Sequence, residues 1–257
     1  MKSGAEHYTD YGPLPGKLVV VEGIDGSGKS TQLDLLRKWI LSQGYSAYLS
    51  EWNSSPIVRS TTKYGKDNRL LSPLTFSLIH TADFADRLDR TILPPLRAGA
   101  IVLTDRYIFT AFARDVARGM DPDYVRRVYR FALQPSVAFY FRVPLDEAMR
   151  RILIGRPELK FYEAGMDLGL SDDPVESFRL FQRRILDEYE RLIPEFDLCV
   201  IDATRPITDQ QRQVRELTRP ILQGCLKLPQ EPHSQWLGEM GISGRYLKDM
   251  HVRPDVL

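Results

Sequence analysis

The chain has 257 residues, of which 43% are hydrophobic and 27% are charged, a composition that suits a packed globular core and argues against global disorder. Its formal net charge is +1, so no overall electrostatic field favours nucleic acid or an anionic membrane as a partner. No apolar run approaches the roughly 18 residues of a membrane span, no apolar signal segment opens the chain, and the two cysteines lack metal or disulfide-framework spacing. We therefore expect a cytoplasmic protein that binds neither nucleic acid nor membrane.

Short apolar runs alternate with helical patterns from residue 17 onward. The runs that predict buried strands are 17–23, 45–51, 100–107, 136–143 and 196–203. The segments with helical periodicity are 30–44, 73–99 with a break near Pro94 and Pro95, 121–133, 144–153, 171–193 and 207–222. No hairpin signal separates the strands, so the alternation indicates the α/β class, with a parallel sheet covered by helices on both faces.

The first predicted strand is followed by a glycine-rich loop with the spacing G-x-x-x-x-G-K-S. Between a strand and a helix, such a loop lets backbone N–H groups converge on phosphate oxygens, and the positive end of the helix adds to the attraction. Lys29 is expected to reach the β- and γ-phosphates of a nucleotide, and Ser30 to ligate Mg²⁺. The residues expected to surround the phosphates are Gly23, Ile24, Asp25, Gly26, Ser27, Gly28, Lys29, Ser30 and Thr31.

A second charged pair, Asp105 and Arg106, ends the predicted strand 100–107. Ligands bind at the carboxyl edge of open parallel sheets, so this pair is expected to share a site with the phosphate loop. The Asp105 carboxylate can hold Mg²⁺ or its waters, and the Arg106 guanidinium can clamp a phosphate.

Five motifs follow one another in the order and at the spacing typical of one enzyme family. They are "EGIDGSGKSTQ" at 22–32, "ADR" at 85–87, "DRY" at 105–107, "VPLDEAMRRI" at 143–152 and "IDATRPIT" at 201–208. Over about residues 17–222 the chain resembles thymidylate kinase. The resemblance implies a P-loop kinase three-layer sandwich with a five-stranded parallel sheet in the order 2-3-1-4-5 and a lid. It also implies ATP with Mg²⁺ as phosphate donor, a nucleoside monophosphate as acceptor, and a homodimer.

The resemblance also assigns roles to single residues. Asp25 would lie near the acceptor sugar and the metal, Arg87 near the acceptor base or phosphate, and Thr204, Arg205 and Pro206 beside the adenine of ATP. The lid would run from about residue 151 to 173 and supply catalytic arginines, with Arg151 and Arg156 as candidates, because the phosphate loop carries no basic residue before Lys29. The remaining expected acceptor contacts are Phe84, Arg106, Tyr107, Thr110 and Arg114.

The acceptor half departs from the family pattern. Asp83 stands where the family has a base-stacking aromatic ring, and Asp115 where it has an amide. Carboxylates accept hydrogen bonds from exocyclic amino groups, which thymine lacks, so these residues predict an acceptor other than thymidylate. The alternative is that both carboxylates pair with Arg87 or Arg114 and never meet the base.

Glu51 and Trp52, at the end of the second predicted strand, support a competing hypothesis. Similar P-loop enzymes, the deoxynucleoside kinases, place a glutamate there as a base for a 5′-hydroxyl, and a free hydroxyl benefits from such a base. Glu51 is therefore also a candidate catalytic and substrate-binding residue. A third hypothesis is a non-catalytic nucleotide-binding regulatory module.

The expected organisation is one kinase domain with two appendages. An N-terminal arm spans residues 1–16, the kinase domain 17–223 and a C-terminal extension 224–257, where the periodicity is lost.

Overall fold

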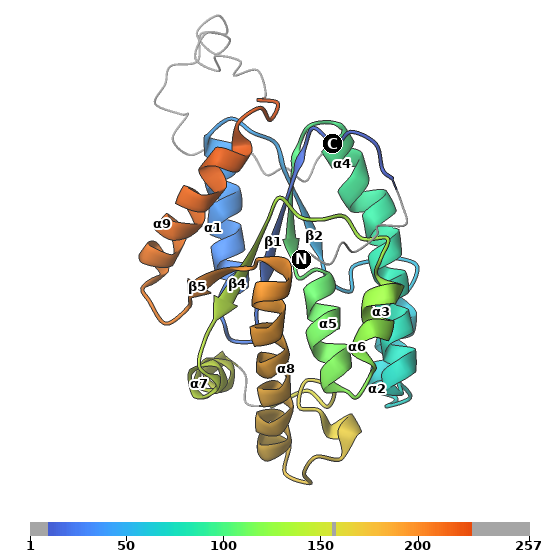
Figure 1. Ribbon diagram of the computed structural model, residues 1–257. Coiled ribbons are helices and arrows are strands. Elements are labelled where there is room, and N and C mark those ends of the chain that lie inside the picture. The colour runs from blue at the N-terminus through green and yellow to red at the C-terminus, as the bar shows by residue number, and fades with distance from the viewer. Residues whose placement is uncertain (1–9, 156–157, 228–257) are drawn as a thin grey trace, which may run out of the picture.

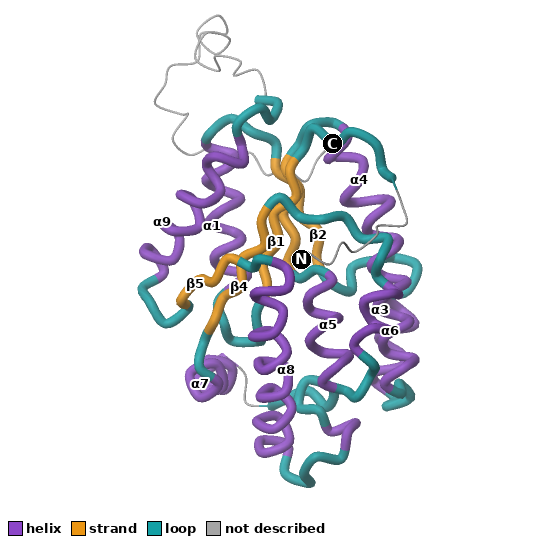
Figure 2. Tube along the Cα trace, in the orientation of Figure 1, coloured by secondary structure: helices purple, strands orange, loops and turns teal. Residues whose placement is uncertain are grey.

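The structure is a computed structural model that describes residues 10–155 and 158–227. A five-stranded sheet runs through its centre, with every neighbouring pair of strands parallel (Figures 1 and 2). The strands are β1 (Lys17–Glu22), β2 (Ala47–Glu51), β3 (Ile101–Asp105), β4 (Val137–Arg142) and β5 (Cys199–Asp202). Their order is β2-β3-β1-β4-β5. The predicted α/β class, P-loop kinase fold and strand order are confirmed.

Helices cover both faces of the sheet. Helix α1 (Lys29–Ser42) packs beside α9 (Ile207–Thr218) on one face, while α5 (Ile108–Ala117) and α8 (Pro174–Phe196) pack together on the other (Figure 1). The remaining helices are α2 (Arg59–Asp67), α3 (Pro73–Arg87), α4 (Leu93–Arg97), α6 (Pro122–Val128) and α7 (Leu145–Gly155). Together they bury the central strands β1, β3 and β4 on both faces, which explains why these strands are apolar without alternation, whereas the edge strand β2 keeps Tyr48 and Leu49 exposed.

The sheet register brings charged side chains to one edge. Val21 of β1 pairs with Asp105 of β3, and Asp105 also pairs with Glu51 of β2. The carboxyl ends of these three strands therefore meet where the phosphate loop leaves β1, which is the edge at which open parallel sheets bind ligands.

The helical segment 73–99 breaks earlier than its prolines predicted. Helix α3 ends at Arg87, a π-helical segment covers Leu88–Ile92, and α4 then begins at Leu93. Pro94 lies in the first turn of α4, where a missing N–H breaks no helical hydrogen bond. The interruption is therefore the extra residue of the π segment and not the proline pair.

Other boundaries also differ from the sequence prediction. Helix α6 ends at Val128, five residues before the predicted end, and α2 and α5 were not predicted. In the described ranges, no helix is both long and apolar enough to span a bilayer. Residues 1–9 of the expected arm and 228–257 of the expected extension lie outside the described residues.

Candidate functional site

The glycine-rich loop joins β1 to α1 in the conformation that its glycines predict. Gly23, Gly26 and Gly28 have φ angles of 146°, 79° and 83°, which disfavour any residue with a side chain. A Cβ atom on Gly26 would also lie 2.5 Å from the carbonyl oxygen of Ala148. Helix α1 begins at Lys29 directly after the loop, so its first unpaired N–H groups and positive dipole end face the loop.

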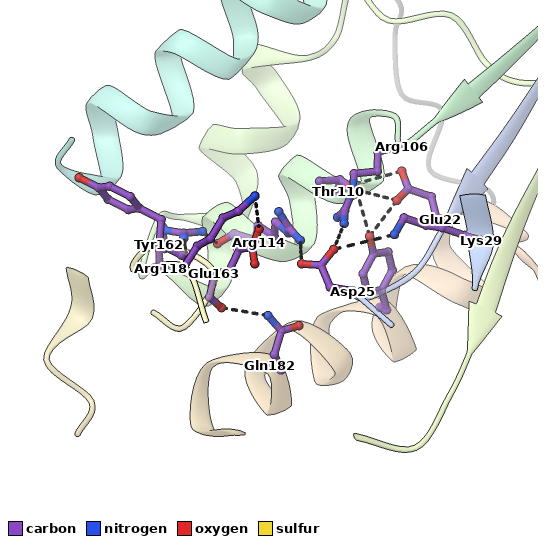
Figure 3. A network of polar contacts seen from close by, with 12 residues as sticks. Glu22, Asp25, Lys29, Arg106, Thr110, Arg114, Arg118, Tyr162, Glu163 and Gln182 are labelled. Carbon is purple, nitrogen blue, oxygen red and sulfur yellow. Dashed lines mark hydrogen bonds and ion pairs between the residues drawn. The ribbon is translucent and has the colours of Figure 1, made fainter. Parts of the chain in front are cut away.

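Three cations converge on the carboxylate of Asp25 in this loop (Figure 3). Lys29 Nζ lies 3.9 Å from Asp25 Oδ1, Arg106 donates a hydrogen bond to the same oxygen, and Arg114 Nη2 donates to Asp25 Oδ2 at 3.0 Å. Burial, together with the positive charge of Arg106, lowers the pKa of Lys29 to about 8, and Asp25 opposes this shift. The sequence predicted Asp25 and all three cations as site residues, but not that one carboxylate would hold them together.

Ser30 and Asp105, the two residues expected to hold a metal ion, are hydrogen-bonded to each other. Ser30 Oγ donates to Asp105 Oδ2 at 2.6 Å, across 75 residues of sequence. Within the described residues, the second carboxylate oxygen of Asp105 is buried and has no hydrogen-bond partner. A hydroxyl beside a carboxylate with a spare buried oxygen is the donor set that a hard divalent cation prefers, so these residues fit Mg²⁺.

A buried carboxylate, Glu22, fixes the turn that carries Arg106. It accepts hydrogen bonds from the backbone N–H of Tyr107 at 2.7 Å and from the backbone N–H and hydroxyl of Thr110 at 3.2 and 2.7 Å. The Tyr189 hydroxyl also donates to it, at 2.8 Å. Burial raises the pKa of Glu22, and the hydrogen bonds oppose that rise. These contacts hold Arg106 in the left-handed region at φ 71°, pointed at the phosphate loop.

Three residues expected to touch the acceptor are instead part of this frame or of the core. Tyr107 and Thr110 are buried, and both hydroxyl groups are used inside the protein, the former donating to Leu133 O at 2.9 Å. Phe84 has no exposed surface and packs against the rings of Tyr107 and Tyr129. This packing does not support a contact with substrate, and we leave the three out of the proposed site.

Arg151 connects the elements on the donor side. Its guanidinium bonds Gly26 O of the phosphate loop at 3.3 Å and Ala203 O, directly before Thr204, at 3.0 Å. A cavity of about 400 Å³ opens here, and Arg151 lines it together with Asp25, Gly26, Ile152, Gly155 and Glu163. The expected adenine loop 204–206 follows β5 and is exposed, whereas Arg156 lies outside the described residues.

Asp83 holds the turn after β2. Its carboxylate accepts from the backbone N–H of Asn53 at 3.1 Å and of Ser55 at 2.8 Å, and it lies 3.5 Å from Arg87 Nη1. Asp83 and Arg87 are both buried. The ion pair that the sequence left as an alternative is present, so Asp83 has a structural task and is not available to an amino group of a base.

The other unusual carboxylate, Asp115, keeps one buried oxygen without a hydrogen-bond partner in the described part of the chain. The Nε2 atom of His80 and the indole N–H of Trp52 are buried without partners in the same sense. The rings of Trp52 and His80 lie edge to face, with centroids 5.4 Å apart. Buried polar atoms are normally paired, so these three atoms are candidates for hydrogen bonds with a bound molecule.

The sequence did not predict Arg118, which holds the segment expected to form the lid. This buried guanidinium donates to Tyr162 O at 2.7 Å (Figure 3). It also donates to Asp167 Oδ2 at 3.1 Å. It also lies between the rings of Phe76 and Phe181, 4.6 and 4.5 Å from their centroids. Its spacing of four residues from Arg114 is a helical signal, but segment 108–117 had not been predicted as a helix.

The fold and this site define a class of protein. A glycine-rich phosphate loop, a hydrogen-bonded Ser–Asp pair that fits Mg²⁺ and a cluster of arginines meet at the carboxyl edge of a parallel sheet in the order 2-3-1-4-5. This combination is that of a P-loop kinase acting on a small phosphorylated substrate.

Comparison with known proteins identifies the family. The family model for thymidylate kinase matches residues 21–214, and the chain belongs to that family. It is 44% identical to a probable thymidylate kinase 2 of Saccharolobus solfataricus over 215 residues, which cover 83% of this chain and 100% of the relative. It is also 32% identical to a probable thymidylate kinase of Thermococcus kodakarensis, over 79% of this chain and 98% of the relative.

Membership of the family settles the reaction class. The chain is an ATP-dependent nucleotide kinase that transfers a phosphoryl group to a nucleoside monophosphate. Membership of this family does not favour the two alternative hypotheses, a deoxynucleoside kinase and a non-catalytic nucleotide-binding module. Glu51, the base of the former hypothesis, is exposed at the end of β2.

Proposed function

We propose that the acceptor is thymidylate and that ATP is used as its Mg²⁺ complex. The observation that carries this proposal is the internal ion pair of Asp83, because it removes one of the two carboxylates that had suggested an amino-bearing base. The full-length similarity to relatives named thymidylate kinase supports the same acceptor.

On the donor side, the loop N–H groups and Lys29 bind the β- and γ-phosphates, and Arg151 braces the loop from α7. Ser30 and Asp105 would hold Mg²⁺, which supplies charge neutralisation across the β- and γ-oxygens when bound. Arg106 lies beside Lys29 through their shared partner Asp25, so it can stabilise charge on the phosphoryl group in transit.

On the acceptor side, Arg106 and Arg114 bind the monophosphate, and the unpartnered polar groups of Asp115, His80 and Trp52 lie on the side that takes the base. A thymine ring offers one N–H, on its N3 atom, between two carbonyl oxygens. The unpartnered oxygen of Asp115 can accept that hydrogen, and the buried guanidinium of Arg87 can donate to a carbonyl. The Asp115 carboxylate can therefore accept a hydrogen bond from the imide N–H of thymine as well as from an exocyclic amino group.

The acceptor is tested by coupling ADP release to a panel of nucleoside monophosphates and nucleosides, with Lys29→Ala as the blank. We expect kcat/KM for thymidylate to exceed that for each amino-bearing monophosphate by at least about tenfold. Preference for deoxycytidylate would contradict the proposal and support an amino-bearing acceptor base, as Asp83 and Asp115 first suggested. Turnover of thymidine that disappears in Glu51→Gln would restore the nucleoside kinase hypothesis.

An exposed apolar surface on α2 and α3 supports a homodimer. Tyr64, Leu70, Leu74 and Leu78 are between 48% and 64% exposed; Leu74 and Leu78 lie four residues apart on α3, and Leu70 lies in the loop before that helix. We expect Leu74→Glu to shift the protein to monomer in sedimentation velocity. Leu153→Glu, on an exposed position of α7, is the matched control and should leave the assembly unchanged.

The domain limits stay predictions, with the kinase domain at 17–223 and the lid at about 151–173. The cytoplasmic location likewise stays a prediction.

A further inference from the structure

Lys66 lies at an unusual place for a lysine. It belongs to the last turn of α2, is partly buried, and lies with Nζ 5.1 Å from the ring centroid of Phe76. Among the described residues, no carboxylate forms an ion pair with its ammonium group. A lysine that points inward over an aromatic ring without an anionic partner has no structural task that explains its charge.

The groups facing Lys66 are mostly positive. The charges that act on it most strongly are Arg114 of α5, Arg118 directly after that helix, and Lys160 and the carboxylate Glu163 of the predicted lid, while His80 of α3 lies in the same group. Burial, together with the positive charges of Arg114 and Arg118, lowers the pKa of Lys66 to about 8, and Glu163 opposes this shift. The same burial keeps the pKa of His80 well below its usual value, so His80 adds no charge near neutral pH. Arg114, Arg118 and Lys160 each pair with a carboxylate, Asp25, Asp167 and Glu163 respectively. Within the described residues, Lys66 is therefore the cation of this group that an anion from outside the chain would balance.

The position of Arg114 connects Lys66 to the reaction site. The Arg114 guanidinium reaches Asp25 in the phosphate loop at 3.0 Å, so α5 presents one cation to the loop and to Lys66. The turn between β2 and α2, which borders the acceptor side, contains Trp52, Asn53 and Ser55 but no basic residue before Arg59. Lys66 of α2 therefore supplies a positive charge on this side of the site, where the turn between β2 and α2 has none.

We propose that Lys66 binds the phosphate of the acceptor nucleotide, together with Arg114. The proposal rests on the proposed function, and it adds a substrate-contacting residue that none of the sequence motifs contains. A phosphate dianion provides the charge that the cluster lacks, and an ammonium on a flexible stem can follow its oxygens. Lys66 and Arg118 both lie over the ring of Phe76, and these contacts help to hold the two cations in place.

Calorimetric titration tests the proposal with three variants. Lys66→Gln removes the charge, Lys66→Arg keeps it, and Lys63→Gln on the exposed side of the same helix is the matched control. Each protein is titrated without ATP, first with thymidylate and then with thymidine, at pH 8 in two buffers of different ionisation enthalpy. Turnover of thymidylate by the wild type is measured alongside, so that failure of the proposed acceptor is seen separately. If another monophosphate proves to be the acceptor, it and its nucleoside replace this pair.

We expect Lys66→Gln to weaken thymidylate binding by about tenfold or more while thymidine binding changes by less than about twofold. The wild type should take up about half a proton on binding thymidylate at pH 8, because the phosphate raises the pKa of a lysine that is about half neutral there. Lys66→Gln should lose that uptake, and Lys63→Gln should behave as wild type.

Two results would overturn the assignment. If Lys66→Gln weakens thymidine as much as thymidylate, Lys66 supports the pocket and does not contact the phosphate. If thymidylate binding and proton uptake are both unchanged, the phosphate lies elsewhere.

Discussion

Replacing Thr110 with valine tests whether this residue belongs to the frame of the site or to the substrate pocket. Valine keeps the shape of threonine but lacks the hydroxyl that donates to Glu22 at 2.7 Å. A hydrogen bond to a charged group contributes about 1.5–3 kcal/mol, and Glu22 Oε2 would retain the Tyr189 hydroxyl. We therefore expect Thr110→Val to lower the free energy of unfolding by about 2 kcal/mol, and the melting temperature by about 4–8 °C.

Urea denaturation measures this loss, and steady-state kinetics shows its consequence for the reaction. Because Thr110 is buried and its hydroxyl is used internally, KM for the acceptor should stay within about twofold of wild type. Thr218→Val is a matched control, since the Thr218 hydroxyl is equally buried but donates to a helical carbonyl, and its loss should cost about 1 kcal/mol or less. If stability is unchanged and KM for the acceptor rises tenfold, Thr110 contacts substrate as the sequence had predicted.

Two further predictions concern α5. Burial raises the pKa of Asp115 to about 6, above its unfolded value, so wild-type stability should fall as pH rises from about 4 to about 6. In Asp115→Asn, the fall in the free energy of unfolding should be smaller than in wild type by up to about 3 kcal/mol. Urea denaturation at pH 4.5 and pH 7 measures the fall in both proteins, and an equal fall in both would contradict the raised pKa of Asp115. Arg118→Lys keeps a positive charge but cannot bond Tyr162 and Asp167 at once, and should lower the free energy of unfolding by about 2–3 kcal/mol. Trypsin should also cut faster at the exposed Lys160, and an unchanged cutting rate would mean that Arg118 does not hold the lid.

The strands of the fold were predictable because each carries its own local signature. A parallel strand buried on both faces is apolar throughout, and every expected strand was found in the sheet. The two missed helices were hidden for different reasons. Helix α5, "IFTAFARDVA", is buried on nearly all sides, so its polar residues Thr110 and Asp115 are not confined to an exposed face, whereas α2, "RSTTKYGKD", buries only Thr62 and Gly65 and has no apolar stripe that marks its buried side.

The same division applies to the site. The phosphate loop was predictable since its chemistry is fixed by neighbouring residues of the chain. The role of Asp83 was not, because its partners Asn53 and Ser55 lie 30 and 28 residues away, in a turn whose path depends on tertiary packing. Arg118 was missed for a related reason, since its contacts are with the lid and with Phe181 of α8.

Asp25, the shared partner of the three site cations, reduces the electrostatic repulsion that gathering these cations would otherwise cause. Lys29, Arg106 and Arg114 would repel one another strongly if they were gathered at one point without an anion. The loop supplies that anion as part of the chain, so the protein carries its own counter-ion and its folding does not depend on nucleotide for electrostatic balance. Under the proposed function, incoming phosphate oxygens would take over cations that the fold has already gathered. These cations would therefore not have to be brought together during the reaction.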